Sequence, residues 1–304
     1  MFEGVRRLTF PLPTRPGHVH AYLLEGDDGW TLVDTGLALP DLEERLAGID
    51  VAVTRIVITH MHPDHIGGGE QARDATGATV FQGELDYAQA LHVWGNPDWP
   101  HTIARWFRAN GVPAEVADEL IEQGSVYTPF IRFARDPEPL RAGDRLDGWE
   151  VLEMPGHADG HLCLLREGVL VAGDHLLAGI SPTVGLWPDS RPDPLGDYVE
   201  SLERTIALGP RLVLPGHGQP LEDAAGRARE LIGHHRRRLD ATEASLSAEA
   251  RTGYEVSYAL FGPDLAPSAR RFAVSETLSH LERLVAEGRA ARERDGGRVS
   301  YTAA

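Results

Sequence analysis

The chain has 304 residues, of which 42% are hydrophobic and 25% are charged, so its composition is that of a globular protein and not of a disordered one. Its length suggests one large domain with a small appendage. The formal net charge is −17, and none of the basic residues is a lysine. Because so acidic a molecule repels phosphate backbones at long range, nonspecific nucleic-acid binding is disfavoured, which leaves a local basic groove as the route to it.

Cys163 is the only cysteine, which excludes an intrachain disulfide and gives no sign of an oxidising compartment. It lies in the apolar run "LCLL", where a buried and inert thiol is expected. The N-terminal stretch "MFEGVRRLTFPLP" lacks the apolar segment of a signal peptide, and no run approaches the roughly 18 apolar residues of a membrane span. We therefore expect a soluble, cytoplasmic protein without a membrane partner.

The first predicted elements are a hairpin, a buried strand and a short helix. Residues 18–34, "HVHAYLLEGDDGWTLVD", predict two strands joined by a Gly-Asp-Asp-Gly turn. "RIVIT" at 55–59 predicts a buried strand, and Pro63 just beyond it can begin a helix. A helix over 70–77 and a strand over 78–82 follow.

Residues 84–127 change in character, becoming helical and rich in aromatic side chains. Short strands are predicted in 149–156, 161–167 and 168–174, then a helix over 194–209 that ends at Gly209, then a strand in "RLVLPGHG" at 211–218. Strands in two groups with helices between them predict a layered α/β protein, with helices outside a central pair of sheets.

The last segment has a pattern of its own. Residues 245–304 predict a helix in "GYEVSYALFG", a second helix in "SETLSHLERLVAEGRA", and a hairpin turned at Gly296 and Gly297. This order suits a small winged-helix domain. We therefore expect a catalytic domain over residues 1–240, carrying the helical insert 84–127, and a C-terminal domain over 245–304.

The stretch "ITHMHPDHIGGG" concentrates metal ligands directly after a predicted buried strand. On an extended chain alternate residues project the same way, so His60 and His62 can share one metal. Asp64 and His65 follow the turn at Pro63 and should face a different point. One motif can therefore begin two neighbouring metal sites.

Further ligands must come from distant sequence, because zinc prefers about four donors. Three other strand ends offer them, each beside a glycine that lets the backbone approach an ion closely. These are "MPGHADGH" with His157 and His161, "VAGDH" with Asp174 and His175, and "LPGHG" with His217.

Taken together, these landmarks resemble the metallo-β-lactamase superfamily over roughly residues 18 to 240. The shared features are the aspartate of "LVDTG", the His-x-His-x-Asp-His run, "PGH", "GDH" and "GHG" in that order. The resemblance implies a four-layer αββα sandwich. It also implies that His60, His62 and His157 bind one metal, that Asp64, His65 and His217 bind the other, and that Asp174 bridges them. Asp34 and His161 would support the ligands from behind, and His175 would be only a neighbour of Asp174.

Two cations about 3.5–4 Å apart can hold one water, lower its pKa from 15.7 to about 7, and polarise a substrate carbonyl or phosphoryl oxygen. The sequence therefore predicts a hydrolase that uses a metal-bound hydroxide, with Asp64 as ligand and as a candidate proton acceptor. A nitrogen-rich site with carboxylates suits two Zn²⁺ ions, and iron or manganese are alternatives.

Because it has an aspartate at position 174, the chain resembles the glyoxalase II-like thioesterases, lactonases and RNA-processing members more than the β-lactamases of the superfamily. A small-molecule thioester, ester or lactone is the expected substrate, and a ribonuclease is the alternative. The chain is also similar to persulfide dioxygenases of the superfamily, but the seven-ligand set disfavours that activity. Glutathione thioesters are disfavoured as well, because the C-terminal part has no basic pocket that matches the glyoxalase II pattern.

The aromatic insert offers a hypothesis for the substrate pocket. It would form a cap in which four side chains enclose an apolar group. The alternative, equally compatible with the sequence, is a helical subdomain with its own core. The four residues are Tyr87, Trp94, Trp99 and Trp106.

Two arginine-rich segments bear on partners. "HHRRRL" at 234–239 and the pair Arg270–Arg271 can form a basic patch for RNA. The net charge favours the other interpretation, in which they are solvated helix faces, a docking surface or a contact between two copies in a homodimer.

Overall fold

The computed structural model describes residues 2–304, which form two compact units. The sheet unit comprises the chain up to residue 95 with 127–182 and 204–228, and the helical unit comprises 96–126, 183–203 and 229–304. The helical insert is therefore divided at residue 95. The predicted junction at residues 240–245 lies at the C-terminal end of α8 (Ala224–Ala244), and the domain assignment stays a prediction.

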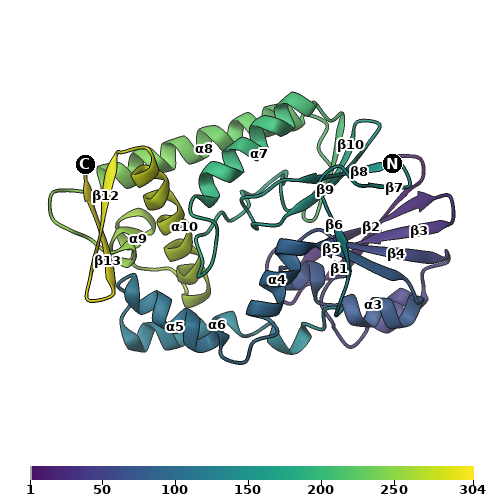
Figure 1. Cartoon of the computed structure of the whole chain (residues 1–304), viewed down its shortest axis with the longest axis horizontal. Coiled ribbons are helices and arrows are strands. Elements are labelled where there is room, and N and C mark those ends of the chain that lie inside the picture. Colours follow the sequence, from purple (N-terminus) through teal and green to yellow (C-terminus); the bar gives the residue numbers. More distant parts are fainter. Residues whose placement is uncertain (1) are drawn as a thin grey trace. The chain divides into compact units, whose positions relative to one another are not determined.

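The sheet unit contains two sheets that face each other (Figure 1). The six-stranded sheet has the order β1 to β6, with β1, β2 and β3 antiparallel and β3 to β6 parallel. Its strands are β1 (Val5–Pro11), β2 (His18–Gly26), β3 (Gly29–Val33), β4 (Val53–Ile58), β5 (Thr79–Gly83) and β6 (Glu138–Leu140).

The five-stranded sheet has the order β11-β10-β9-β8-β7, antiparallel except for the parallel pair β10 and β11. Its strands are β7 (Arg145–Leu146), β8 (Trp149–Glu153), β9 (Leu162–Arg166), β10 (Val169–Gly173) and β11 (Leu212–Pro215). The end of α7 (Pro194–Leu208) contacts this sheet, where Arg204 donates a hydrogen bond to the carbonyl oxygen of Glu153 at 2.8 Å.

Alternation along the strands separates two cores. Leu32 and Ile56 belong to the core beneath α1 (Leu42–Ala47) and α3 (Gly69–Thr76), whereas the next residues, Val33 and Val57, belong to the core shared with the second sheet. Successive strand residues point to opposite faces, and burying a side chain of this size contributes about 1.5–3 kcal/mol. The expected αββα sandwich is confirmed.

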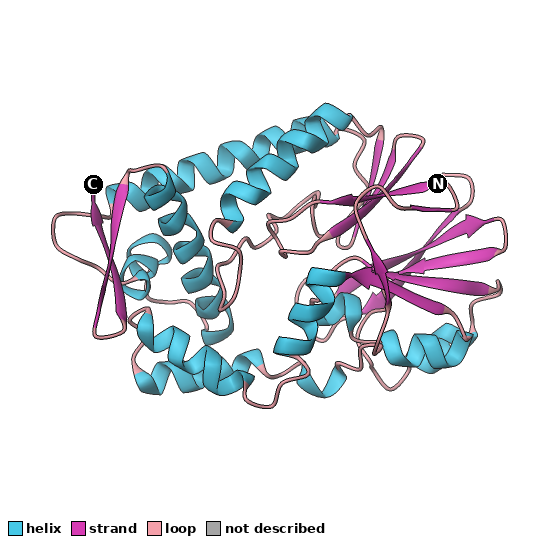
Figure 2. Ribbon diagram, viewed as in Figure 1, coloured by secondary structure: helices cyan, strands magenta, loops and turns pink. Residues whose placement is uncertain are grey.

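The helical unit is built from helices and one hairpin. Figure 2 draws helices in cyan and strands in magenta. The structure confirms the predicted order of two helices and a hairpin turned at Gly296 and Gly297, although α10 begins earlier than expected, at Pro267. The assignment as a winged helix stays a prediction. Besides the larger parts of α7 and α8, its elements are α5 (Trp99–Ala109), α6 (Ala114–Gly124), α9 (Gly253–Phe261), α10 (Pro267–Ala286), β12 (Ala290–Asp295) and β13 (Arg298–Ala303).

Membrane insertion finds no support in the helices. Among the described residues, no helix is both long and apolar enough to cross a bilayer.

Candidate metal centre

All seven predicted ligands lie in the sheet unit, in segments that follow its strands. His60 and His62 follow β4, Asp64 and His65 lie in the short helix α2 (Pro63–Ile66), and the others follow β8, β10 and β11. Residues as distant in sequence as His65 and His217 thus become neighbours, with ring centroids 5.6 Å apart.

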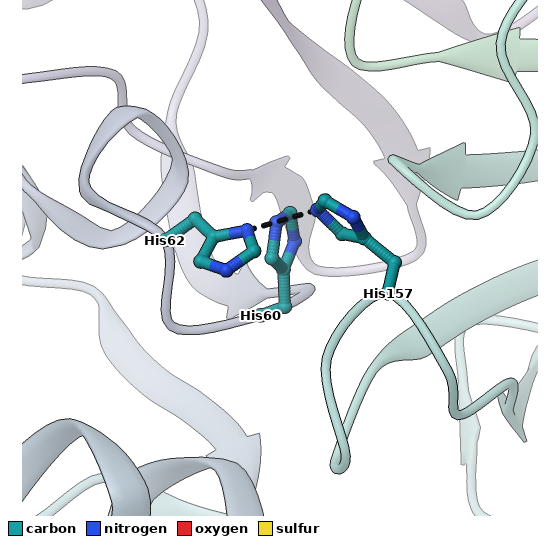
Figure 3. A group of neighbouring side chains, drawn as sticks. All are labelled: His60, His62 and His157. Carbon is teal, nitrogen blue, oxygen red and sulfur yellow. Dashed lines mark hydrogen bonds between the residues drawn. The ribbon is translucent and has the colours of Figure 1, made fainter. Parts of the chain in front are cut away.

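The three histidines of the first group converge, as Figure 3 shows. One ring nitrogen of each lies within 4.8 Å of the others. His62 Nδ1 and His157 Nε2 are 2.9 Å apart. Two imidazole lone pairs repel each other at such a distance unless a proton or a cation lies between them, so this arrangement suits a cation that both rings bind.

The second group consists of Asp64, His65 and His217, whose ligand atoms also lie within 4.8 Å of one another. His217 Nε2 is 3.3 Å from Asp64 Oδ2, and His65 Nε2 is 4.0 Å from the same oxygen. Asp64 is the most exposed of these side chains, at 24% compared with 6% for His217. Solvent therefore reaches the centre from the side of Asp64.

Asp174 faces both groups. Its Oδ2 atom is 3.3 Å from His217 Nε2 and 3.7 Å from His157 Nε2, and its Oδ1 atom is 3.5 Å from His65 Nε2. Together with His60 and His65 it makes a third potential ligand group. This position is the one that a bridging carboxylate requires.

Unpartnered atoms test whether these residues fit metal ions. His60 Nε2, His65 Nε2 and Asp174 Oδ1 are buried and make no hydrogen bond with the described residues. A buried polar atom without a partner costs about 1–3 kcal/mol, so three in one cluster require another explanation. Nitrogen and carboxylate donors that converge in this way fit divalent cations.

Comparisons with known proteins agree with this geometry. A family described as the metallo-beta-lactamase superfamily matches residues 14–217, and one described as a metallo-beta-lactamase-like C-terminal domain matches residues 239–304. The chain belongs to the metallo-beta-lactamase superfamily.

Individual relatives extend over nearly the whole chain. A probable metallo-hydrolase of Bacillus subtilis, YqjP, is 31% identical over 94% of this chain and 93% of its own. The crystal structure of a metallo-beta-lactamase family protein from Thermus thermophilus covers 100% of this chain and 99% of that one, at 36% identity and a TM-score of 0.85. A beta-lactamase domain protein from Burkholderia ambifaria covers 100% and 93%, at 28% identity and a TM-score of 0.87. This superfamily member is thus a metal-dependent hydrolase.

The electrostatics differ between the two ligand groups. Burial lowers the pKa of His62 to about 3, and burial together with the neighbouring His65 ring holds the pKa of His60 well below its usual range. Both rings are therefore neutral at pH 7, which is the form that binds a metal.

Carboxylates dominate the second group. Burial acts to lower the pKa of His217, yet attraction to Asp174 raises it to about 10. Burial likewise opposes protonation of His65, but the surrounding carboxylates, Asp174 the strongest, raise its pKa well above the usual range. The carboxylates thus draw positive charge to this point, and a metal ion can take the place of the protons.

Asp34 lies behind the loop that carries His60 to His65, which is the place that the resemblance implies for it. It adopts a left-handed backbone conformation with φ 63° at the end of β3. Its carboxylate accepts hydrogen bonds from the backbone N–H and the hydroxyl of Thr59, both at 2.8 Å, and lies 2.7 Å from His65 Nδ1. Because the carboxylate of Asp34 binds Nδ1 of His65, the other ring nitrogen, Nε2, is left to face the ligand groups.

The structure separates the roles of the other two histidines. His161 Nε2 accepts a hydrogen bond from the backbone N–H of Asp174 at 3.1 Å, so this ring positions Asp174. It belongs to none of the three ligand groups. His175 points away, with its Nε2 at 2.7 Å from the hydroxyl of Thr205.

Two histidines that we did not single out hold the His217 loop. His217 Nδ1 donates to the backbone oxygen of His18 at 2.7 Å, and His18 Nε2 accepts from the N–H of Gly218 at 3.2 Å. His20 Nε2 lies 2.9 Å from the oxygen of Gly218. The signal was present in "HVHAYLL", where alternate histidines of one strand face the same side.

A glycine beside His217 meets the requirement for close approach. A Cβ atom at Gly216 would lie 2.5 Å from Asp174 Oδ1 and 2.7 Å from His65 Cε1. Any side chain here would displace a ligand, so the residue must be glycine.

The four aromatic residues of the expected cap belong to two different units. Tyr87 and Trp94 pack against the core of the sheet unit, whereas Trp99 and Trp106 pack against the core of the helical unit. The ring centroids of Trp106 and Trp187, a residue of the same unit, are 5.9 Å apart. Trp99 and Trp106 therefore help to form a core, as the alternative interpretation requires, and their contact with a substrate stays a prediction.

Proposed function

We propose that this hydrolase uses two zinc ions to cleave a thioester, ester or lactone bond of a small molecule. The observation that carries the proposal is the position of Asp174, whose carboxylate faces His157 of one ligand group and His217 of the other. A carboxylate between two such groups favours a dinuclear centre over a mononuclear one.

Each residue has a part in this proposal. His60, His62 and His157 would hold one ion, Asp64, His65 and His217 would hold the second, and Asp174 would bind both. When bound, two such ions lower the pKa of a water between them and stabilise the negative charge that develops on a substrate oxygen. His65 and His217 hold the pKa of Asp64 low against the effect of burial, so its carboxylate is ionised, which is the form that binds a metal.

The choice of zinc rests on the donors, because imidazole nitrogens with carboxylates suit it. A protein crystallised in a di-iron-bound form is 27% identical over 71% of this chain, with a TM-score of 0.50. This similarity supports two metals and makes iron the competing element. Elemental analysis of protein purified without added metal tests this. Two equivalents of zinc are expected, and less than one equivalent of any transition metal would overturn the dinuclear proposal.

The substrate class is supported by similarity and by the ligand set. A hydroxyacylglutathione hydrolase from Alkalilimnicola ehrlichii is 32% identical over 148 residues, which are 49% of this chain and 42% of that one. Its name describes hydrolysis of an acyl group from a thiol carrier, which is the bond type that we propose. The net charge of −17 argues against RNA as the substrate.

An assay of acyl thioesters, aryl esters and lactones beside single-stranded RNA tests the reaction. We expect turnover of at least one small-molecule class, loss of that turnover in His60→Ala, and normal turnover in His101→Ala, which removes an exposed histidine of α5. Turnover of RNA alone would replace our proposal with a ribonuclease. If the aromatic insert admits the acyl group, Trp99→Ala should raise KM for a hydrophobic substrate.

A further inference from the structure

Met61 separates the ligands His60 and His62, and both of its backbone polar groups are bound by α4 (Glu84–Val93) and the residue that ends it. The N–H of Met61 donates to Asp86 Oδ1 at 2.9 Å. Its carbonyl oxygen accepts from Trp94 Nε1 at 2.8 Å, and Trp94 is the C-cap residue of α4. The backbone between the two ligands is therefore fixed from both sides.

Asp86 is itself held firmly. Its side chain is 0% exposed, and its second oxygen accepts a hydrogen bond from Gln82 Nε2 of β5 at 2.5 Å. An acidic residue in the first turn of a helix is common and normally faces solvent, where it complements the helix dipole. Complete burial of this carboxylate, with both oxygens bonded, requires a different explanation.

The loop that carries His157 also lies against the start of α4. A Cβ atom at Gly160 would be 2.6 Å from the backbone nitrogen of Asp86 and 2.8 Å from its Cβ. Only a glycine can approach so closely, and Gly160 lies three residues after His157. The same turn of α4 thus touches the loops that supply all three histidines of the first group.

The second ligand group has other supports. His65 Nδ1 is held by Asp34, and His217 Nδ1 by the backbone oxygen of His18. Neither contact involves α4. These supports of the second group thus lie outside α4, although Asp34 also binds Thr59 beside His60. A change at Asp86 should therefore act chiefly on the first group.

We infer that Asp86, assisted by Trp94, is a positioning residue that sets the geometry of the three-histidine metal site without being a ligand. This inference rests on the metal-binding part of the proposed function and is independent of the substrate. It assigns α4 the role of a support that places the backbone at Met61 and the loop at Gly160.

Metal affinity measured at each site separately tests the inference. The His217→Ala variant isolates the three-histidine site, and the His62→Ala variant isolates the other. Asp86→Ala, Asp86→Asn and Trp94→Phe are each added to both backgrounds, and the Kd for Zn²⁺ is measured by competition with a chromophoric chelator. Thermal melts in chelator establish that each variant folds.

In the His217→Ala background, Asp86→Ala should weaken Zn²⁺ binding by about 10- to 100-fold, the usual effect of removing a residue that supports a ligand. Asp86→Asn should recover part of the loss, because its amide oxygen can still accept from Met61. Trp94→Phe should weaken binding by about fivefold, the value of one neutral hydrogen bond. In the His62→Ala background all three should change the Kd by less than about twofold, within the scatter for uncoupled sites.

Glu84→Gln is the matched control, since it alters another acidic residue in the first turn of α4, whose exposed carboxylate accepts from Arg141 at 2.6 Å. It should leave the Zn²⁺ Kd unchanged in both backgrounds. The d–d absorption of the Co²⁺ form gives a second readout, which should change with Asp86→Ala only in the His217→Ala background.

Equal weakening in both backgrounds, or none in either, would overturn the inference. If Asp86→Ala does not fold, the same comparison is made with Asp86→Asn and Trp94→Phe. If the His217→Ala protein with Asp86 intact binds no metal, the metal site itself fails and the proposed function falls with it. If the His217→Ala protein binds Zn²⁺ and Asp86→Ala does not change the Kd, only the role of Asp86 is overturned.

Discussion

The sheet unit and the helical unit each bury a cluster of histidines, but with different partners. At the metal centre, His65 and His217 face the carboxylates of Asp64 and Asp174. In the helical unit, His235 Nδ1 lies 3.3 Å from His280 Nε2, and His280 Nδ1 donates to the backbone oxygen of Glu276 at 2.7 Å. One cluster is bonded to carboxylates and the other to itself and to backbone.

The pKa values express this difference. Burial lowers the pKa of His235 to about 3 and that of His280 to about 4. The same penalty acts on His217, where Asp174 reverses it and raises the pKa to about 10. Burial alone therefore produces a neutral histidine pair that helps to form a core, whereas burial next to carboxylates produces a place where positive charge is stable. Among the described residues, potential ligand groups occur only in the sheet unit.

Removing the charge of Asp174, the proposed bridging ligand, should make the candidate metal centre resemble the histidine pair of the helical unit. In Asp174→Asn the side chain keeps its size and loses its charge, so neither ligand group retains its shared anion. We expect a fall in kcat/KM well beyond the roughly 100-fold that loss of an outer contact causes, and less than one equivalent of metal after dialysis. Asp50→Asn, which breaks an exposed ion pair with Arg6, should keep both values. Full metal content in Asp174→Asn would contradict the assigned bridge.

Metal removal should act on one unit and spare the other. A ligand present at about 100 times its Kd stabilises the folded state by about 2.7 kcal/mol, and this amount is lost on chelation. Amide hydrogen exchange with and without chelator should show faster exchange around Thr59, Asp174 and His217, with little change in α9 and α10. Added Zn²⁺ should restore protection. Equal loss of protection in both units would mean that the helical unit also depends on the metal.

The strands and the ligands were predictable for the same reason. "RIVIT" and "GVLVAG" are apolar runs bounded by turn residues, and the donors follow them directly in the sequence. Both signals are local and identify candidate donors, and the resemblance to the superfamily then selects seven of them, which the structure brings together. Their assignment as ligands is tested by the metal-binding experiments.

The supports of the site were harder to find, because each one acts over a long distance in the sequence. Asp86 looks like an ordinary acidic residue in a first helical turn, and only the fold places its carboxylate 2.9 Å from the N–H of Met61. His18 serves His217 across 199 positions through its backbone oxygen, a contact that any residue type could make, so only the alternate histidines of "HVHAYLL" pointed to it. The division of the aromatic insert at residue 95 also depends on tertiary packing, since helical spacing continues on both sides.

Asp34→Asn should weaken the metal centre and leave the histidine pair of the helical unit unaffected. The new amide group would face donors on Thr59, and the bond that orients His65 Nδ1 would be lost or reversed. We expect about 10- to 100-fold weaker Zn²⁺ binding, measured by chelator competition. Asp50→Asn again serves as the control. Unchanged affinity would show that backbone packing alone holds the loop.

The smallest expected effect concerns pH and the His235 pair. As pH falls below 6.5, the unfolded chain binds a proton at His235. The folded protein binds this proton only near pH 3, because burial lowers the pKa of His235 to about 3. The free energy of unfolding therefore decreases by about 1.4 kcal/mol per pH unit for that residue. The groups around His235 are His280 of α10, the ring of Tyr198 at 5.6 Å, and His234 and Arg238 of its own helix. His235→Gln removes this proton-binding group and keeps a donor for His280. The free energy of unfolding, measured with urea between pH 6.5 and 4.5, should therefore depend less steeply on pH by that amount. His101→Gln controls for the loss of a histidine from the exposed surface. Equal slopes in His235→Gln and the unaltered protein would mean that His235 is protonated in the folded state, and the contrast between the two clusters would then not rest on charge.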